Sequence, residues 1–375
     1  MITRARNRPA IEAELDGSSC RTLHFVYHDL GLWPHDLTFE KHKAAMELHY
    51  YLWQFGAYDL ARRLHSEIGF DVAQHVTFVR YWMPSLFSLL PIPFVWGPVG
   101  GGESMPGTFH RSLNQNARLF EYSRSMFRWL GEHDPLVRMT ARRCAVALAT
   151  TRETADRLER IGVQHVELMS ELALAQTDLK RLGQMSWLQN EPVRFVSIGR
   201  LLHWKGFHLG LQAFAEAGID GSEYWIIGNG PEEERLRALA RELGVQRSVK
   251  FWGRLTRGET LQKLGQSRAL VHPSLHDSGG WVCVEAMAAR RPVICLDIGG
   301  PSYQVSHEVG YKIPAHSPKQ CIEGLAAAMR AVADDQEKNK KLGETGYRRV
   351  AELFTWNKKI QMMLDVYTKV LQQDV

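Results

Sequence analysis

Short apolar runs alternate with amphipathic stretches through the second half of the chain. Each run is at most seven residues long, is rich in β-branched and aromatic residues, and ends in Gly, Pro or Asp: Val193–Gly199, Tyr224–Gly228, Val249–Gly253, Ala269–Pro273 and Pro292–Asp297. Nearly continuous apolar character is typical of strands buried on both faces of a parallel sheet. Helical patterns lie between the runs, and one of them opens at Pro231 with three glutamates and ends at Gly244. This alternation predicts a doubly wound α/β domain.

The first half alternates in the same way, though less regularly. The expected strands are Leu23–His28, Asp71–Val76, Phe94–Gly97 and Ala145–Thr150. The expected helices are Glu40–Ile68, Asn114–Arg143 and Arg152–Ile161. The pattern breaks near Gln184–Pro192, which predicts an N-terminal domain over residues 1–187 and a second domain over 188–355. Residues 356–375 contain one further helix pattern. Two α/β domains facing a cleft are expected to bind ligands beyond the carboxyl ends of their strands.

The segment Asn114–Arg143 combines basic and large apolar residues. It carries six arginines interleaved with residues such as Phe120, Phe127 and Trp129. One interpretation is a surface helix pair with a solvated basic face. The other is a basic amphipathic surface that lies on anionic lipid, which would make the protein a peripheral membrane protein.

Composition narrows the class of protein. The chain has 375 residues, enough for two or three domains of about 150 residues. Its net charge of +5 is too small to indicate a nucleic-acid partner. The five cysteines show no metal-binding spacing, which favours free thiols in a reducing compartment. No apolar run reaches the roughly 18 residues of a membrane-spanning helix, and the N-terminus has no secretory signal pattern. We therefore expect a cytoplasmic protein.

Two cations follow the first strand of the second half. Arg200 comes directly after Gly199, and Lys205 stands five residues later. Arginine offers a fixed fork of donors and lysine a compact charge, a combination that suits a pyrophosphate at a cleft edge. The alternative is a solvated turn with two ordinary surface charges. Gly228 and Gly230 follow the next strand and would let the backbone approach a ligand closely.

The most informative segment runs from His272 to Ala288. Asp277 lies in the loop after a strand, and Glu285 lies about one turn into the next helix, so both carboxylates can reach one cleft. Gly279 and Gly280 leave backbone amides uncovered at the helix start, where anionic or hydroxyl-rich ligands bind well. Two acids and free amides suit a sugar. The alternative is a pair of acids that only stabilise the helix.

Taken in order, these motifs resemble those of the retaining family 4 ("group 1") glycosyltransferases, which have the GT-B fold of two Rossmann-like domains. The shared set is GR(x4)KG, GxGP, HPS, an acid separated from Glu285 by seven residues, EAMA and a following GG loop. The resemblance covers the second half. It implies a nucleotide-sugar donor, no metal and no cofactor, and a last helix that crosses back onto the first domain.

Site residues carry over by position. The resemblance implies that Arg200 and Lys205 hold the donor diphosphate and that Glu285 binds the ribose. Asp277 stands where the family usually has a glutamate whose loop, here with Ser278, contacts the donor sugar. Arg254 and Leu255 would border the base.

The first half resembles the acceptor domain of the same family. His75 is assigned the role of the family's functional histidine; the alternative is a histidine bonded to a backbone carbonyl. The loop of Gly100, Gly101, Gly102 and Glu103 follows a buried strand and is assigned to acceptor binding or interdomain closure. Family members open with a strand, a Gly-rich loop and a helix, and we expect this unit to be missing here.

The resemblance therefore implies transfer of a hexosyl group to an acceptor hydroxyl with retention of configuration, in surface polysaccharide or glycolipid synthesis. The acceptor would be a glycan or a lipid-linked sugar, and no nucleic acid is involved. One alternative is a catalytically inactive scaffold that binds a nucleotide sugar, and another is a GT-B-type epimerase. A dinucleotide oxidoreductase is disfavoured because no strand leads into GxGxxG.

Overall fold

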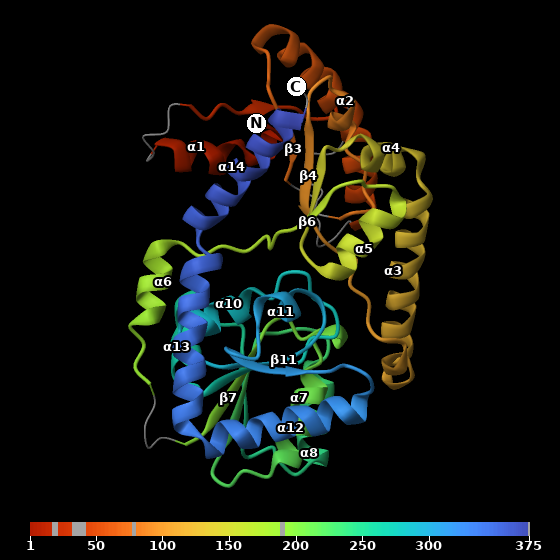
Figure 1. Ribbon diagram of the computed structural model, residues 1–375. Helices are drawn as coiled ribbons and strands as arrows, with labels where there is room; N and C mark the ends of the chain where they lie inside the picture. Colours follow the sequence, from red (N-terminus) through yellow and green to blue (C-terminus); the bar gives the residue numbers. More distant parts are fainter. Residues whose placement is uncertain (17–21, 32–42, 77–79, 188–191, 374–375) are drawn as a thin grey trace.

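Two parallel sheets organise the chain, one in each half, and they form the cores of two lobes (Figure 1). The computed structural model describes residues 1–16, 22–31, 43–76, 80–187 and 192–373. The prediction of an α/β protein with two such domains is confirmed.

The N-terminal lobe contains short strands and longer helices, some of them joined by 3-10 turns. Its elements are β1 (Ile2–Thr3), α1 (Arg8–Asp16), β2 (Val26–Tyr27), α2 (Lys43–Ile68), β3 (Ala73–His75), β4 (Phe94–Val99), α3 (Gln115–His133), α4 (Pro135–Arg143), β5 (Val146–Ala149), α5 (Arg152–Ile161) and β6 (Val166–Leu168). The expected helix Asn114–Arg143 is two helices because Asp134 and Pro135 end one and begin the next. α5 has the predicted bounds, since Thr151 caps its start and Gly162 ends it in the left-handed region.

The C-terminal lobe alternates strands and helices after the linking helix α6 (Gln176–Gly183). Its elements are β7 (Arg194–Ile198), α7 (Phe207–Ala217), β8 (Glu223–Ile227), α8 (Glu233–Glu242), β9 (Val249–Gly253), α9 (Arg257–Gly265), β10 (Ala269–His272), α10 (Trp281–Ala288), β11 (Val293–Leu296), α11 (Gly299–Gln304), β12 (Gly310–Ile313), α12 (Pro318–Asp334), α13 (Gln336–Leu353) and α14 (Trp356–Gln373). The GG loop of the motif set, which follows β11 at Asp297–Pro301, is in part helical, because α11 already begins at Gly299.

Both faces of the C-terminal sheet are buried. Phe195 and Val271 pack into the hydrophobic cluster on one face, and their neighbours Val196 and Leu270 pack into the cluster on the other. This two-sided burial explains why the strands read as continuous apolar runs rather than as alternating patterns.

The strand order fixes where a ligand can bind. The C-terminal sheet has the order β12-β11-β10-β7-β8-β9, and all its neighbours are parallel. The chain starts at β7, winds outward through β9 and then returns to the other side of β7 with β10. The loops that follow β7 and β10 therefore flank the point where the winding reverses, which is the ligand crevice of an open α/β sheet.

The N-terminal sheet is smaller and has the order β3-β4-β5-β6, while β1 and β2 pair separately. Within the described residues, β1 pairs only with β2, and β3 only with β4. A cavity of about 510 Å³ is lined by residues of β1, α2 and β3. The expected lack of a first strand–helix unit stays a prediction.

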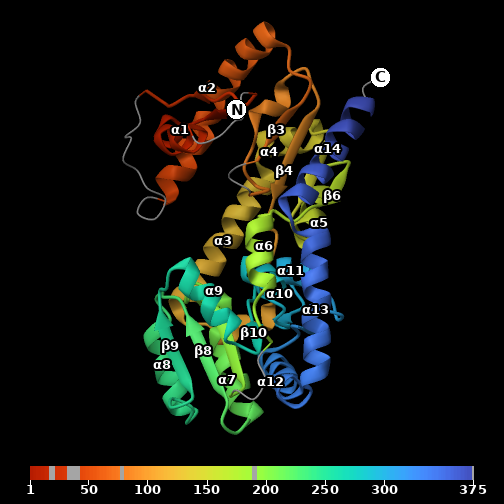
Figure 2. The same cartoon turned by 90° about the vertical axis from the view of Figure 1, so that its left-hand side faces the viewer.

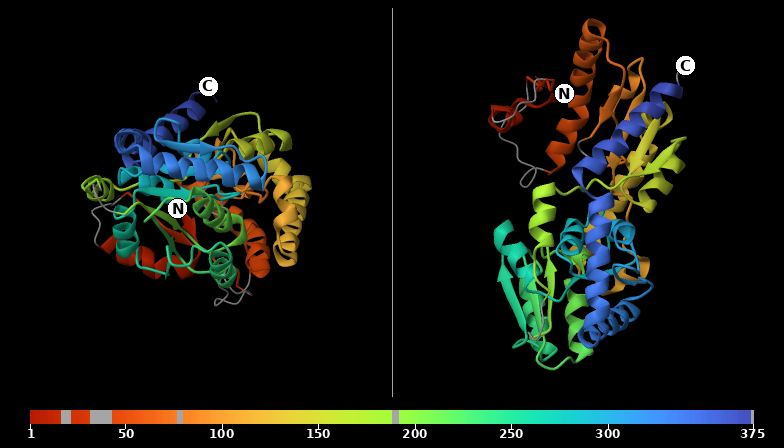
Figure 3. Two further views of the ribbon diagram at one scale, coloured as in Figure 1. Left: turned by 90° about the horizontal axis from the view of Figure 1, so that it is seen from below. Right: turned by 60° about the vertical axis from the view of Figure 1, so that its left-hand side comes forward.

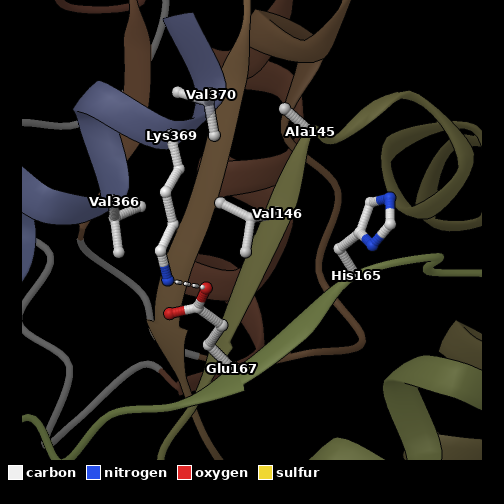
Figure 4. Close-up of a pocket in the computed structure, with 7 residues that line it drawn as sticks. All are labelled: Ala145, Val146, His165, Glu167, Val366, Lys369 and Val370. Atoms are coloured by element: carbon white, nitrogen blue, oxygen red, sulfur yellow. Dashed lines mark hydrogen bonds and ion pairs between the residues drawn. The ribbon is translucent and has the colours of Figure 1, made fainter. Parts of the chain in front are cut away.

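The last helix connects the lobes. In Figures 1 and 2, α13 and α14 follow one another from the lower lobe to the upper one. Figure 4 shows α14 against the N-terminal sheet, where Val366 and Val370 face Val146 across a cavity of about 80 Å³. On the same side, the Lys369 ammonium lies 3.0 Å from the Glu167 carboxylate. The C-terminal helix thus packs on strands that precede it by about two hundred residues.

The arginines of α3 do not form one solvated face, which corrects that interpretation of Asn114–Arg143. Arg124 and Arg128 point inward and donate to the carbonyl oxygen of Glu103 at 2.8 Å and 2.9 Å. A loop that leaves a strand has carbonyl groups without a ladder partner, and guanidinium groups satisfy them. Arg118, by contrast, is exposed.

Candidate functional site

The loop after β7 carries both predicted cations, Arg200 and Lys205, in different surroundings. Arg200 is exposed, and its guanidinium makes no hydrogen bond or ion pair with any residue that the structure describes, although its carbonyl oxygen accepts from the Leu202 amide at 2.8 Å. Lys205 ends a 3-10 turn, and its ammonium lies 2.5 Å from a carboxylate oxygen of Asp277. Lys205 and Asp277 come from the loops after β7 and β10, so the pair stands at the reversal point of the sheet.

Asp277 is held in its charged form. Burial alone would raise its pKa, but a 3.2 Å hydrogen bond with His272 and the charge of Lys205 outweigh burial and hold the pKa far below its usual range. The side chains of Lys205 and Asp277 are 22% and 16% exposed, so solvent still reaches the pair. A partly exposed ammonium with further protons to donate can bind an anion without leaving Asp277.

A glycine lets the two loops meet. Gly206 has φ of +67°, and a Cβ on it would lie 1.9 Å from the carbonyl oxygen of Pro273. Only a residue without a side chain permits this approach in this conformation. Gly206 thus holds Lys205 within reach of Asp277.

We expect Gly206→Ala to lower the free energy of unfolding by about 1–3 kcal/mol, the cost of a strained left-handed residue, with the clash added to it. Gly258→Ala on α9 is the matched control, because Gly258 has no atom within 4 Å of its Cβ position. Urea titration followed by circular dichroism measures both. Equal stability of the two variants would contradict the packing argument.

The predicted glycines after β7 and β8 pack against each other. A Cβ on Gly228 would lie 1.9 Å from the carbonyl oxygen of Gly199, and one on Gly230 would lie 2.5 Å from that of Leu201. These glycines are therefore required for loop-to-loop contact. Their assignment to donor binding stays a prediction.

Glu285 belongs to a neighbouring cluster. Its carboxylate accepts a 2.9 Å hydrogen bond from the indole of Trp281 and lies 3.3 Å from the guanidinium of Arg257. Burial raises the pKa of Glu285, opposed by Arg257. Arg257, which sequence reasoning missed, also lies 3.0 Å from Asp178 on α6 and ties Glu285 to the linker.

The residues assigned to the base lie beside this cluster. Arg254 and Leu255 connect β9 to α9, directly before Arg257. Arg254 is exposed, whereas Leu255 is half-buried against the hydrophobic cluster behind the sheet.

Next to Asp277, two backbone amides remain available. Neither Gly279 nor Gly280 donates its amide hydrogen to another residue in the described part of the chain. They precede α10, so both the amides and the helix dipole favour negative charge at this position.

The N-terminal lobe meets this loop with its triple glycine. A Cβ on Gly100 would lie 3.0 Å from Cβ of Ser278, and one on Gly102 would lie 2.5 Å from the backbone of Thr154. Gly101 packs against Trp82 in the same way, with its amide 3.1 Å from the Glu103 carboxylate. The loop is thus closely packed and touches the C-terminal lobe.

Glu103 is buried in this interface. Its carboxylate accepts hydrogen bonds of 2.6 Å and 3.0 Å from Thr151 and Thr154. Its Cγ would lie 3.4 Å from a Cβ on Gly299, at the start of α11. Glu103 therefore faces the C-terminal lobe, while its carboxylate accepts these hydrogen bonds from residues of its own N-terminal lobe.

Glu171, which no sequence motif marked, also faces the donor-side loop. One of its carboxylate oxygens would lie 2.9 Å from a Cβ on Gly279. Burial is the main cause that raises the pKa of Glu171, and the charges of Glu103 and Asp277 add to it. Carboxylates of the N-terminal lobe thus face two C-terminal loops, Glu171 at Gly279 and Glu103 at Gly299.

A second missed feature clamps the lobes together. Glu121 on α3 is buried and accepts hydrogen bonds from His203 at 2.9 Å and His276 at 3.1 Å. We call these three residues the interdomain clamp. The ring of Trp204 stacks between Phe120 and His276, with centroids 4.9 Å and 5.3 Å away. The clamp histidines flank Lys205 and Asp277 in sequence, so α3 fixes both loops of the crevice.

His75 lies elsewhere in the N-terminal lobe. Its Nε2 is 2.6 Å from the hydroxyl of Tyr50 on α2, and both residues line the 510 Å³ cavity. The predicted histidine is thus at the edge of the N-terminal sheet, at the end of β3. Its acceptor role stays a prediction.

The described residues form no metal-holding group and expose none of their cysteine thiols. No three His, Cys, Asp or Glu side chains among them are arranged to hold a metal ion. The four described cysteines, Cys144, Cys283, Cys295 and Cys321, are buried free thiols, and Cys20 lies outside the described residues. No described helix combines the length and the apolar character needed to span a bilayer.

Residues 185–349 match the protein family described as "Glycosyl transferases group 1". The curated relatives include the lipopolysaccharide core biosynthesis glycosyltransferase LpsD of Rhizobium meliloti, which is 31% identical over 176 residues. That alignment spans 46% of this chain and 49% of LpsD, so about half of the relative is matched.

Solved structures extend the likeness to both lobes. Sucrose-phosphate synthase of Thermosynechococcus elongatus has a TM-score of 0.61 at 18% identity, covering 93% of this chain and 84% of that one. HepE of Anabaena in complex with UDP has a TM-score of 0.58 at 16% identity, covering 84% and 82%. The fold is therefore that of GT-B glycosyltransferases, and the C-terminal lobe is similar in sequence to group 1 enzymes.

Proposed function

We propose that the chain is a glycosyltransferase that moves a hexosyl group from a nucleoside-diphosphate sugar to an acceptor hydroxyl, with retention at the anomeric carbon. The observation that carries this proposal is the Lys205–Asp277 pair at the reversal point of the C-terminal sheet. The free amides of Gly279 and Gly280 adjoin it, and the loop at Gly100 faces it from the other lobe.

The reaction needs stabilisation of a leaving diphosphate. The bond from the anomeric carbon to the phosphate oxygen breaks, a bond to the acceptor oxygen forms, and the acceptor proton passes to the departing phosphate. Negative charge grows on the diphosphate, and preorganised donors aimed at it lower the barrier. We assign that role to Lys205, Arg200 and the amides of Gly279 and Gly280, while Asp277 keeps Lys205 in place.

The nucleoside would lie toward Glu285. A buried carboxylate with one oxygen engaged by Trp281 can accept hydrogen bonds from the two ribose hydroxyls. Arg254 and Leu255 would border the base. UDP is the first nucleotide to test, because HepE has the same fold and its structure is described as a UDP complex.

On the acceptor side we place His75 and the loop of Gly100–Glu103. The name of LpsD supports a role in surface polysaccharide or glycolipid synthesis. We infer that the chain works at the cytoplasmic face of a membrane, in peripheral contact with it.

A screen of nucleotide sugars by thermal shift tests donor binding, since a ligand at 100 times its dissociation constant adds about 2.7 kcal/mol of stability. The donor that binds is then incubated with and without glycan acceptors, and released nucleoside diphosphate is measured. Acceptor-dependent release supports transfer. Binding without release identifies an inactive scaffold, and conversion of the donor sugar alone identifies an epimerase.

Glu285→Ala is expected to weaken binding of the free nucleotide about tenfold or more, because hydrogen bonds to a charged group contribute roughly 1.5–3 kcal/mol each. Isothermal calorimetry measures the affinity. Glu344→Ala is the control, because Glu344 forms a half-exposed ion pair with Arg290 on the outside of α13. Unchanged affinity in Glu285→Ala would refute the ribose assignment while leaving the diphosphate assignment intact.

A further inference from the structure

Helix α3 has its apolar side chains on the outside. Six large apolar residues lie on one side of it and are between 49% and 69% exposed: Leu119, Tyr122, Met126, Phe127, Trp129 and Leu130. Their spacing of three or four residues places them along one stripe. We call this stripe the outer face of α3. Figures 1 and 3 show the helix at the margin of the molecule.

The inner side of the same helix is polar. Glu121 belongs to the interdomain clamp, and Arg124 and Arg128 bind carbonyl groups of the loop after β4. A helix that only had to cover a core would present the opposite pattern. Apolar residues of this size, gathered on one solvent-facing stripe, mark a surface that contacts something else.

Charge selects the kind of partner. α3 has two carboxylates, and both are engaged inward: Glu121 in the clamp, and Glu132 with Arg157 at 2.6 Å. Arg118 is exposed in the first turn of the helix, and Arg111 is exposed in the 3-10 turn that precedes it. The outer face thus joins apolar residues to positive charge, with no exposed carboxylate on the helix.

We propose that the outer face of α3 docks on the surface of an anionic lipid bilayer. A helix of 19 residues is a rod about 28 Å long, which suits a planar interface better than a pocket. Trp129 and Tyr122 have rings that settle at the headgroup level, and arginines attract anionic lipids. The helix would lie in the plane of the interface without spanning the bilayer.

The C-terminal helix provides an internal comparison. α14 also exposes apolar residues, among them Ile360 and Leu364. However, Lys358 and Asp365 are both exposed on that helix, so its exposed charges include a carboxylate, which the exposed residues of α3 lack. We therefore assign lipid binding to α3 and not to α14.

Co-sedimentation with vesicles tests the proposal. The intact protein is mixed with vesicles of phosphatidylcholine alone or of equal parts phosphatidylcholine and phosphatidylglycerol. The protein should bind the anionic vesicles, and Met126→Glu/Leu130→Glu should weaken binding about tenfold or more, since both side chains would leave the interface. Ile360→Glu/Leu364→Glu on α14 is the matched control and should bind like the wild type. Arg111→Gln should weaken binding most at low salt.

Several results would overturn the inference. One is a wild type that fails to bind the anionic vesicles, and another is equal binding of the α3 and α14 variants to these vesicles. A third such result is binding to neutral vesicles as strong as binding to anionic ones. A lipid-free dimer in light scattering that Met126→Glu/Leu130→Glu dissociates would show that a second copy covers the outer face instead. The assay contains no sugar donor, so its failure is distinct from failure of the proposed transferase activity.

Discussion

Lys205→Ala is expected to lower turnover by about 10²–10³, the loss typical of one removed donor to a developing negative charge. The ammonium of Lys205 lies 2.5 Å from Asp277, which precedes Gly279 and Gly280 at the start of α10, and we propose that the diphosphate accumulates its charge at this position. Donor affinity should fall less than turnover, because the charge on the bridging oxygen grows only as the bond breaks.

The same substitution also removes the partner of Asp277, and the test must separate the two effects. Taking away one member of a largely buried pair leaves an uncompensated carboxylate. We therefore expect Lys205→Ala to be less stable than the wild type. The double variant Lys205→Ala/Asp277→Asn should regain stability, because both charges are gone, but it should stay slow.

Lys250→Ala supplies the matched control. Lys250 also lies 2.5 Å from a carboxylate, that of Glu223, but at the far edge of the sheet on β9. Its removal should leave turnover unchanged. Nucleoside diphosphate release at saturating donor measures all three variants. Near-normal turnover of folded Lys205→Ala would remove the diphosphate assignment.

The sequence predicted those parts of the site that lie in short, ordered segments. Lys205 and Asp277 could be placed together because each follows a strand of one parallel sheet, and the carboxyl ends of such strands share an edge. The strands themselves were readable because two-sided burial makes them apolar throughout.

Contacts between the lobes could not be predicted in this way. No local motif marks Glu121, and its partners His203 and His276 are 82 and 155 residues away. The arginines of α3 were misread for the same reason, since their carbonyl partners lie in a loop of irregular structure. These contacts depend on how the two lobes meet, and the hydrophobic periodicity of a single segment does not indicate that arrangement.

The interdomain clamp gives the second large effect. Glu121→Ala should lower the free energy of unfolding by about 3 kcal/mol or more, since hydrogen bonds to a charged group contribute roughly 1.5–3 kcal/mol each and two are lost. It should also raise the KM for the donor more than it changes turnover, because Lys205 and Asp277 keep their own contact while their loops lose the support of α3. Glu344→Ala, a surface pair, should change stability by no more than about 1 kcal/mol.

The pH dependence of this effect follows from the charges in the clamp. Burial would raise the pKa of Glu121, but hydrogen bonds from His203 and His276, with the charge of Arg124, outweigh it and lower the pKa far below the usual range. The stabilisation by Glu121 is therefore complete above a pH of about 4.3, the pKa of a glutamate in the unfolded chain. It is lost as the pH falls through the lower pKa of Glu121 in the folded protein. Burial lowers the pKa of His276 as well, so its protonation also favours the unfolded state as the pH drops below about 6.5.

Denaturant titrations of the wild type and Glu121→Ala should show a stability difference that is full near neutral pH and shrinks in acid. A difference that stays constant down to the acid limit would mean that Glu121 acts there as a neutral packing residue and that the clamp carries no charge.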